Sequence, residues 1–280
     1  MSARLSDISA HIANVRQLEA VVTAIRGIAA SHAQQSRARL GTIETYLNII
    51  ARAIGELLRK APPGWEATNP ATQNKPSALI LFCTEGGFCG GLSDHVLNAV
   101  ASELLTSIVF GIGTRGIAIA RERGVSFDWT AAMANQIGAA PAVAERVAEA
   151  LYTGIAEGQF IKADVIYPRP EGSGFVIERM SLLPFDVGRF LTTDEAQPPR
   201  TDLPFETLIE QMANEYVYAQ LCNAAIHAFE AENEARVAAM VAARAHIEET
   251  LVELLMHEHR ARQEEITNEI AELSASLSSY

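Results

Sequence analysis

Apolar residues recur at spacings of three and four in two runs of the first 60 positions, residues 5–25 and 40–57, and no proline interrupts residues 5 to 59. This spacing is typical of a long helix whose apolar seam faces another helix, and its second run fits a strict heptad. At ~1.5 Å per residue, roughly 55 residues would form a rod of about 80 Å. The apolar positions are Leu5, Ile8, Ile12, Val15, Leu18, Val22, Ile25, Leu40, Ile43, Leu47, Ile50, Ile54 and Leu57.

The same spacing returns near the C-terminus. The sequence has no proline after Pro204, and residues 205–277 predict helix almost throughout, about 110 Å long at ~1.5 Å per residue. Two such helices at opposite ends predict a long antiparallel coiled coil. The alternative is two separate amphipathic helices packed on a middle domain. The C-terminal apolar positions are Ile247, Leu251, Leu254, Ile266, Ile270, Leu273 and Leu277.

Between the two helical patterns the period changes. The proline-rich stretch 61–76 predicts a loop, after which short apolar runs alternate with amphipathic segments, as in a mostly parallel open sheet. An antiparallel pair, 162–170 with 174–185, is expected beside it. Strands are predicted at 78–83, 107–112 and 125–129, and helices at 92–106, 116–123 and 141–157.

The predicted fold is therefore α/β: a mostly parallel open, Rossmann-like sheet domain together with the coiled coil. Three parts are expected, namely an N-terminal coiled-coil helix over 1–60, the middle domain over 77–190 and a C-terminal coiled-coil helix over 205–280.

Charge divides the two helices. The chain carries 34 acidic and 22 basic residues, a formal net charge of −12, which argues against nucleic acid as a main partner. Residues 1–60 hold eight basic and four acidic residues, whereas 230–280 hold four and eleven. Opposite signs suit an antiparallel pair.

Other classes of protein are disfavoured by simple patterns. No uncharged apolar run approaches the roughly 18 residues of a membrane span, and no signal core precedes the first helix. The three cysteines form no CxxC pair and no zinc spacing, as expected where thiols stay reduced. A cytosolic chain without a span of its own is expected.

Two glycine-rich turns invite a nucleotide-binding interpretation. TEGGFCGG (84–91) and GIGTRG (111–116) both lack the GK[ST] element, and the second lacks the third glycine of GxGxxG. Tight strand-to-helix turns are the favoured interpretation. Cys89 has no histidine at a fixed distance, and His257 and His259 point to different helix faces. Neither a cofactor, a metal ion nor a catalytic residue is predicted.

Several motifs are similar to those of one family. The C-terminal segment is RARQEEITNEIAEL (260–273), preceded by NEYVYAQLCNAAIHAFEAENEARVAAM (214–240). The middle contains GGFCGGL (86–92), GTRG (113–116) and SLLP (181–184). With the two terminal helices and the α/β middle, these motifs make the chain resemble the gamma subunit of F-type ATP synthases over essentially its whole length. A divergent bacterial member is expected.

The resemblance implies a mechanical and non-catalytic role. In that family the coiled coil is the shaft inside a ring of α and β subunits (α3β3), and the α/β middle domain with the lower end of the coil sits on the ε subunit and the membrane c ring. Proton or sodium flow turns the c ring, and the shaft drives the β catalytic sites through different nucleotide affinities. The implied location is peripheral, at the cytoplasmic face of the bacterial inner membrane. The implied contacts to β are Arg26, Gly27, Arg236, Arg262, Gln263, Thr267 and Glu269.

The sequence also departs from the family pattern. Gly27 stands where the family has a bulky residue, and Arg244 and His246 replace positions of its upper C-terminal helix. These departures leave open a degenerate paralogue that acts as a structural or binding protein without rotation. The two glycine-rich loops leave open a second alternative, an α/β enzyme with helical extensions.

Overall fold

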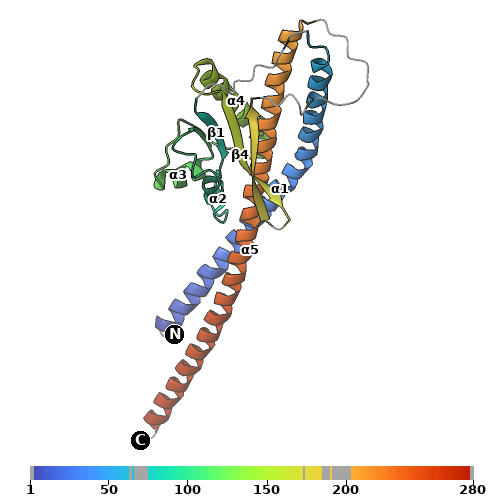
Figure 1. Ribbon diagram of the computed structural model, residues 1–280. Coiled ribbons are helices and arrows are strands. Elements are labelled where there is room, and N and C mark those ends of the chain that lie inside the picture. The colour runs from blue at the N-terminus through green and yellow to red at the C-terminus, as the bar shows by residue number, and fades with distance from the viewer. Residues whose placement is uncertain are drawn as a thin grey trace. The chain divides into compact units, whose positions relative to one another are not determined.

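The computed structural model describes residues 3–62, 65, 75–172, 174–184, 190 and 203–277. Its longest elements are the helices α1 (Ala3–Leu58) and α5 (Phe205–Leu277), close to the extents that the apolar spacing predicts (Figure 1). Most of the predicted loops 61–76 and 186–204 lies outside the described residues. The three-part division at 1–60, 77–190 and 205–280 stays a prediction.

The chain forms two compact units, and α1 and α5 contribute to both. Met1–Ala29 and Arg236–Tyr280 make up the rod unit, and Ala30–Ala235 make up the α/β unit.

A five-stranded sheet organises the α/β unit. Its order is β3-β2-β1-β4-β5, with β1 to β4 parallel and β5 antiparallel to β4. This confirms the mostly parallel sheet with an added antiparallel pair. The strands are β1 (Ser77–Phe82), β2 (Ile108–Ile112), β3 (Trp129–Ala131), β4 (Lys162–Glu171) and β5 (Gly174–Leu183).

Helices cover both faces of this sheet (Figure 1). Side chains of β1 alternate between the two faces, as a strand requires. Ile80 and Phe82 join a buried cluster with α4 (Ala140–Ala156) and α5. Leu79 and Leu81 join another with α2 (Leu92–Ala99) and α3 (Thr114–Glu122). A strand covered on both faces explains why its sequence is continuously apolar.

Within the α/β unit, α5 lies directly against the sheet. Small residues on this helix allow the close approach, because the cluster that it forms with the strands includes Ala224, Ala225 and Ala228, all at most 3% exposed. The seam of α1 packs on the same helix, since Leu47, Ile50 and Ile54 form one buried cluster with Ala219. The coiled-coil seam predicted from residues 40–57 is therefore real within this unit.

In the rod unit the first residues of α1 run antiparallel to the end of α5. Val22, Met240 and Ile247 form its apolar cluster. Ser9 Oγ donates a hydrogen bond of 3.1 Å to Glu258 Oε1, so early residues of α1 meet late residues of α5. The antiparallel coiled coil is confirmed.

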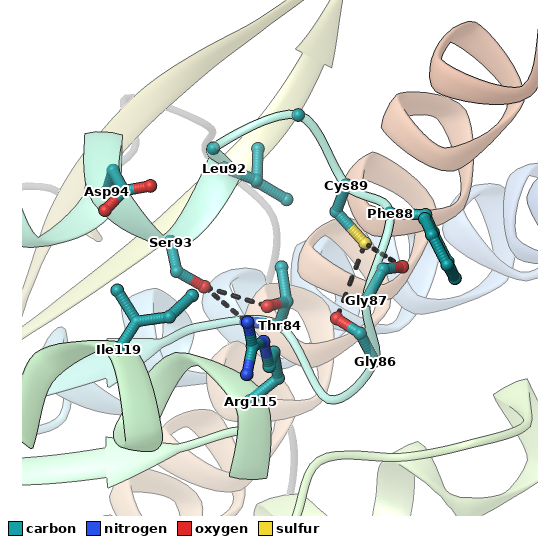
Figure 2. A pocket seen from close by; sticks show the side chains of 12 residues that line it. Thr84, Gly86, Gly87, Phe88, Cys89, Leu92, Ser93, Asp94, Arg115 and Ile119 are labelled. Carbon is teal, nitrogen blue, oxygen red and sulfur yellow. Dashed lines mark hydrogen bonds between the residues drawn. The ribbon is translucent and has the colours of Figure 1, made fainter. Parts of the chain in front are cut away.

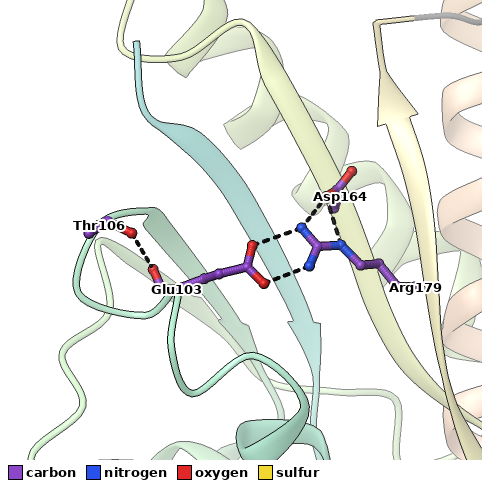
Figure 3. Close-up of polar contacts among 4 residues, drawn as sticks. All are labelled: Glu103, Thr106, Asp164 and Arg179. Atoms are coloured by element: carbon purple, nitrogen blue, oxygen red, sulfur yellow. Dashed lines mark hydrogen bonds and ion pairs between the residues drawn. The ribbon is translucent and has the colours of Figure 1, made fainter. Parts of the chain in front are cut away.

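The predicted helix over 92–106 is too long. The α-helix stops at Ala99, and the amides of Val100, Glu103 and Thr106 bond carbonyls three residues back, which marks tighter turns. Glu103 forms an ion pair of 2.7 Å with Arg179 of β5, which lowers the pKa of Glu103 (Figure 3). Because Arg179 also bonds Asp164 of β4 at 2.6 Å, this segment is tied to two strands.

The predicted strand over 125–129 is displaced. The ladder with β2 begins only at Trp129, and Phe127 and Asp128 contact β2 outside it. The ring of Phe127 covers Gly111, where a Cβ would lie 2.6 Å from it. Asp128 forms two hydrogen bonds with Val109. Its amide donates to the Val109 carbonyl at 2.9 Å, and its carboxylate accepts from the Val109 amide at 2.8 Å.

A buried histidine lies between α5 and the sheet. The ring of His227 stacks on that of Tyr167, with centroids 5.9 Å apart. Burial lowers the pKa of His227 from 6.5 to about 4, with Glu178 raising it and Arg169 lowering it to smaller extents. The folded chain therefore holds this ring neutral, whereas the unfolded chain protonates it below about pH 6.5. We therefore expect His227 to lower the folding stability as the pH drops from about 6.5 to about 4.

We expect His227→Phe to remove this acid sensitivity. The variant should gain up to about 3 kcal/mol relative to wild type between pH 7 and pH 4, as urea unfolding would measure. Nδ1 of His227 has no hydrogen-bond partner among the described residues, so an apolar ring sacrifices no such bond there. His246→Gln, at an exposed position, should keep the wild-type slope. Equal slopes for His227→Phe and wild type would contradict the assignment.

Candidate functional site

The residues singled out for partner contact all lie in the rod unit. Arg26 and Gly27 are on α1, where Arg26 is half-buried and Gly27 is exposed. A Cβ built on Gly27 meets no atom within 4 Å, so packing inside the chain does not require glycine there. The nearby apolar residues Leu18, Val21 and Ile28 are exposed and share one face of the helix.

The C-terminal candidates follow one another along α5. Arg262 and Glu269 are seven residues apart and share a face, and Gln263 and Thr267 share a neighbouring one. All four side chains are exposed. Arg262 reaches back to Glu258 at 3.4 Å, and the Thr267 hydroxyl donates to the Gln263 carbonyl at 2.8 Å. These contacts lie within the helix and leave the outward face open.

The end of α5 is uncovered. From Arg262 to Ser274, every side chain that the structure describes is exposed except that of Glu265, which is half-buried. This segment nevertheless keeps an apolar stripe, because Ile266, Ile270 and Leu273 are 50%, 61% and 64% exposed. Clustered exposed apolar residues mark interaction surfaces. We call Arg262–Ser274 the open segment.

Two further arginines of α5 are placed differently. Arg236 is half-buried at the first position of the rod-unit part of α5. Arg244 lies 3.8 Å from Glu19 of α1 and 2.9 Å from Glu248. The arginine that departs from the family pattern thus forms an ion pair between the two helices of the rod.

The glycine-rich turns lie at the carboxyl end of the sheet (Figure 2). Thr84 bonds Ser93 Oγ through its amide at 3.1 Å and its hydroxyl at 2.9 Å, and Cys89 Sγ donates to the Gly87 carbonyl at 3.1 Å. Arg115 lines the same shallow hollow of about 200 Å³. In GIGTRG, a Cβ on Gly116 would lie 2.2 Å from Cys83 Cβ, which confirms a tightly packed strand-to-helix turn.

Sequence reasoning missed a set of glutamates on α5. Glu230, Glu232 and Glu234 alternate in the run EAENE (230–234). Glu232 accepts hydrogen bonds from the amides of Glu85 and Gly86, and Glu230 and Glu234 both pair with Arg37 of α1. The available signal was the charge itself, because a glutamate inside a buried helical run requires a partner.

No helix in the described part of the chain is long and apolar enough to cross a membrane.

A family model described as ATP synthase matches residues 4–279. The chain belongs to the ATP synthase gamma family.

Curated members of this family match over nearly their whole length. The ATP synthase gamma chain of Polaromonas naphthalenivorans is 27% identical, with 96% of each chain covered. That of Acidithiobacillus ferrooxidans is 25% identical, with 98% of each chain covered. The family's gamma chains are non-catalytic stalk subunits, so the family gives no reason to seek a catalytic centre here.

Solved structures share the fold. The Euglena gracilis mitochondrial ATP synthase rotor has a TM-score of 0.68 at 14% identity, covering 94% of this chain and 99% of that one. A chain of the central stalk and c ring of the Tetrahymena thermophila enzyme has a TM-score of 0.56 at 18% identity, covering 80% and 99%. The combination of long terminal helices with a mixed sheet is thus a fold that this chain shares with those chains.

Proposed function

We propose that this chain is the central-stalk rotor of a rotary ATP synthase. The observation that carries the proposal is the open segment: Arg262–Ser274 keeps an exposed apolar stripe at helical spacing in a member of the gamma family. A partner that surrounds the end of α5 would bury this stripe. The proposed partners are the α and β subunits of the α3β3 ring, with the ε subunit and the c ring at the α/β unit.

Rotation requires unequal contacts. A shaft that touched every β subunit identically could shift no equilibrium between their nucleotide affinities. The open segment supports this proposal, since it exposes two different surfaces, the polar set Arg262, Gln263 and Glu269 and the apolar stripe. An arginine fork suits a charge-assisted contact with an acidic loop of β. Arg26, Gly27, Arg236 and Thr267 complete the proposed contact set.

The remaining parts of the proposal concern location and energy source. The complex would lie at the cytoplasmic face of a bacterial inner membrane, with this chain bound peripherally and without a span of its own. Flow of protons or sodium ions through the c ring would drive the shaft. No observation favours a paralogue that has lost rotation, because the ion pair of Arg244 with Glu19 gives that departure a place in the rod.

Reconstitution with α and β subunits tests the proposal. We expect the chain to stimulate ATP hydrolysis by α3β3, and Arg262→Ala combined with Gln263→Ala to lower turnover by about tenfold, equivalent to ~1.4 kcal/mol. Losing one charge-assisted hydrogen bond of ~1.5–3 kcal/mol would suffice. Arg121→Ala, which removes an exposed arginine from α3 in the α/β unit, is the control and should be close to wild type. Hydrolysis that responds neither to the chain nor to the double variant would refute the proposal.

A further inference from the structure

The loop after β1 occupies a special place in the sheet. Because β1 pairs with β2 on one side and β4 on the other, the strand order reverses between β1 and β4. In doubly wound folds, the crevice at the carboxyl ends of such strands binds ligands, and backbone N–H groups of the first strand-to-helix loop hold their anionic groups. The loop 84–91 is the corresponding loop here.

In this chain a carboxylate from the long helix binds this loop. Glu232 is 4% exposed, and its two oxygens accept the amide of Glu85 at 2.8 Å and that of Gly86 at 3.0 Å. Cys89 of the loop and Leu92 at the start of α2 pack with Ala231 of the same helical turn as Glu232. The α5 side chain thus supplies the negative charge that an external ligand would bring.

A second carboxylate, that of Glu85, extends this hydrogen-bonded connection to the loops that follow the neighbouring strands. The side chain of Glu85 accepts the Thr114 amide at 2.9 Å, the Thr114 hydroxyl at 2.8 Å and the Met133 amide at 2.7 Å. Thr114 follows β2, and Met133 follows β3. Glu232 and Glu85 therefore join α5, in two steps, to the loops that follow three parallel strands.

The same turn of α5 is also held from its opposite side. Residues i and i+4 of a helix share a face, whereas i+2 points away from it. Glu230 and Glu234 accordingly face α1, where Arg37 Nε bonds Glu230 at 2.9 Å and its Nη2 pairs with Glu234. Burial raises the pKa of Glu230, and Arg37 opposes this shift. Residues 230–234 are thus clamped between the sheet and α1.

We infer that Glu232 occupies the anion position of the α/β fold and thereby fixes the rotation of α5 about its own axis relative to the sheet. Apolar packing along α5 is non-directional, whereas a carboxylate shared by two successive amides is strongly directional. This inference rests on the proposed function: in a rotor, Glu232 is the positioning residue at which turning of the sheet becomes turning of the helix.

Hydrogen exchange on the full chain tests the bond itself. In Glu232→Gln, the amides of Glu85 and Gly86 should exchange at least about tenfold faster, because one lost charge-assisted hydrogen bond is worth ~1.5–3 kcal/mol. Glu210→Gln removes the same charge from an exposed site of the same helix and should leave these amides unchanged. Unchanged exchange in Glu232→Gln would overturn the inference.

Chemical rescue adds a readout that general destabilisation would not give. Glu232→Ala opens a space the size of a carboxymethyl group, so excess acetate should slow exchange at Glu85 and Gly86 again, while chloride at equal ionic strength should not. Glu232→Gln fills that space, so its exchange should not respond to acetate. If the alanine variant does not fold, the exchange measured in Glu232→Gln still tests the bond. Failure of acetate to rescue a folded alanine variant would contradict an anion position.

The mechanical part is tested in the complete ATP synthase in vesicles. We expect Glu232→Gln to retain ATP hydrolysis and lose part of ATP-driven ion pumping, with Glu210→Gln as the control. Faster exchange without loss of pumping would overturn the mechanical role of Glu232. A wild-type chain that fails to stimulate α3β3 would instead refute the proposed function, so the two failures are distinct.

Discussion

Replacing Gly113 by alanine should destabilise the α/β unit by about 3 kcal/mol or more. Gly113 has φ +107°, a region that L side chains rarely adopt. Its added Cβ would lie 2.4 Å from the Cys83 carbonyl oxygen and 2.7 Å from that of Thr84. Both atoms belong to the backbone at the end of β1, so the clash can be relieved only by moving the strand.

Two glycines separate the causes of this effect. Gly124 has φ +79° but open space around it, so Gly124→Ala should cost only the backbone strain, about 1 kcal/mol. Gly138 has open space and no positive φ, so Gly138→Ala should be nearly neutral. Urea unfolding followed by the fluorescence of Trp129, in a Trp65→Phe background, would measure all three. Equal costs at Gly113 and Gly124 would show that the close approach is not decisive.

Phe160→Ala is the second large effect, expected to cost about 3–5 kcal/mol. Phe160 is fully buried just before β4 and makes an edge-to-face contact with Phe110 at 5.9 Å. The absence of a side chain on Gly154 gives its ring room, since a Cβ there would lie 2.5 Å from it. Truncation would leave a cavity walled by the sheet and α4, which the rigid strands cannot close.

The same fluorescence assay measures this loss. Leu105→Ala removes an apolar side chain that is 94% exposed, and it should leave the free energy of unfolding unchanged. Phe160→Leu keeps most of the volume and should cost about 1.5 kcal/mol or less. A Phe160→Ala variant as stable as Leu105→Ala would mean that the core closes over the cavity.

Local periodicity explains which parts of the fold the sequence could predict. The seam from Leu40 to Leu57 and the continuous apolar run of β1 carry their signals within a few residues, and both predictions are confirmed. The helix over 92–106 and the strand over 125–129 were misjudged, because Arg179 and Val109, which bind Glu103 and Asp128, are distant in sequence.

The candidate site likewise has a part that the sequence could predict and a part that it could not. The contact set of the rod unit came from a resemblance in motifs, and the structure adds that Arg262, Gln263, Thr267 and Glu269 are exposed on a helix end that nothing in the described chain covers. The bonds of Glu232 could not be predicted, since backbone amides leave no sequence signature. The spacing of the three glutamates in 230–234 could only indicate that two opposite faces require partners.

The unbroken course of α5 from Phe205 to Leu277 has a consequence for how this protein can vary. Each residue added to a helix turns everything beyond it by about 100° and moves it by about 1.5 Å. One residue inserted between Glu232 and Arg262 would therefore rotate the helix face that carries the apolar stripe of the open segment by about 100° relative to the face that carries Glu232. The number of residues in this stretch is therefore constrained as well as the identity of its buried residues, such as Met240 and Ile247.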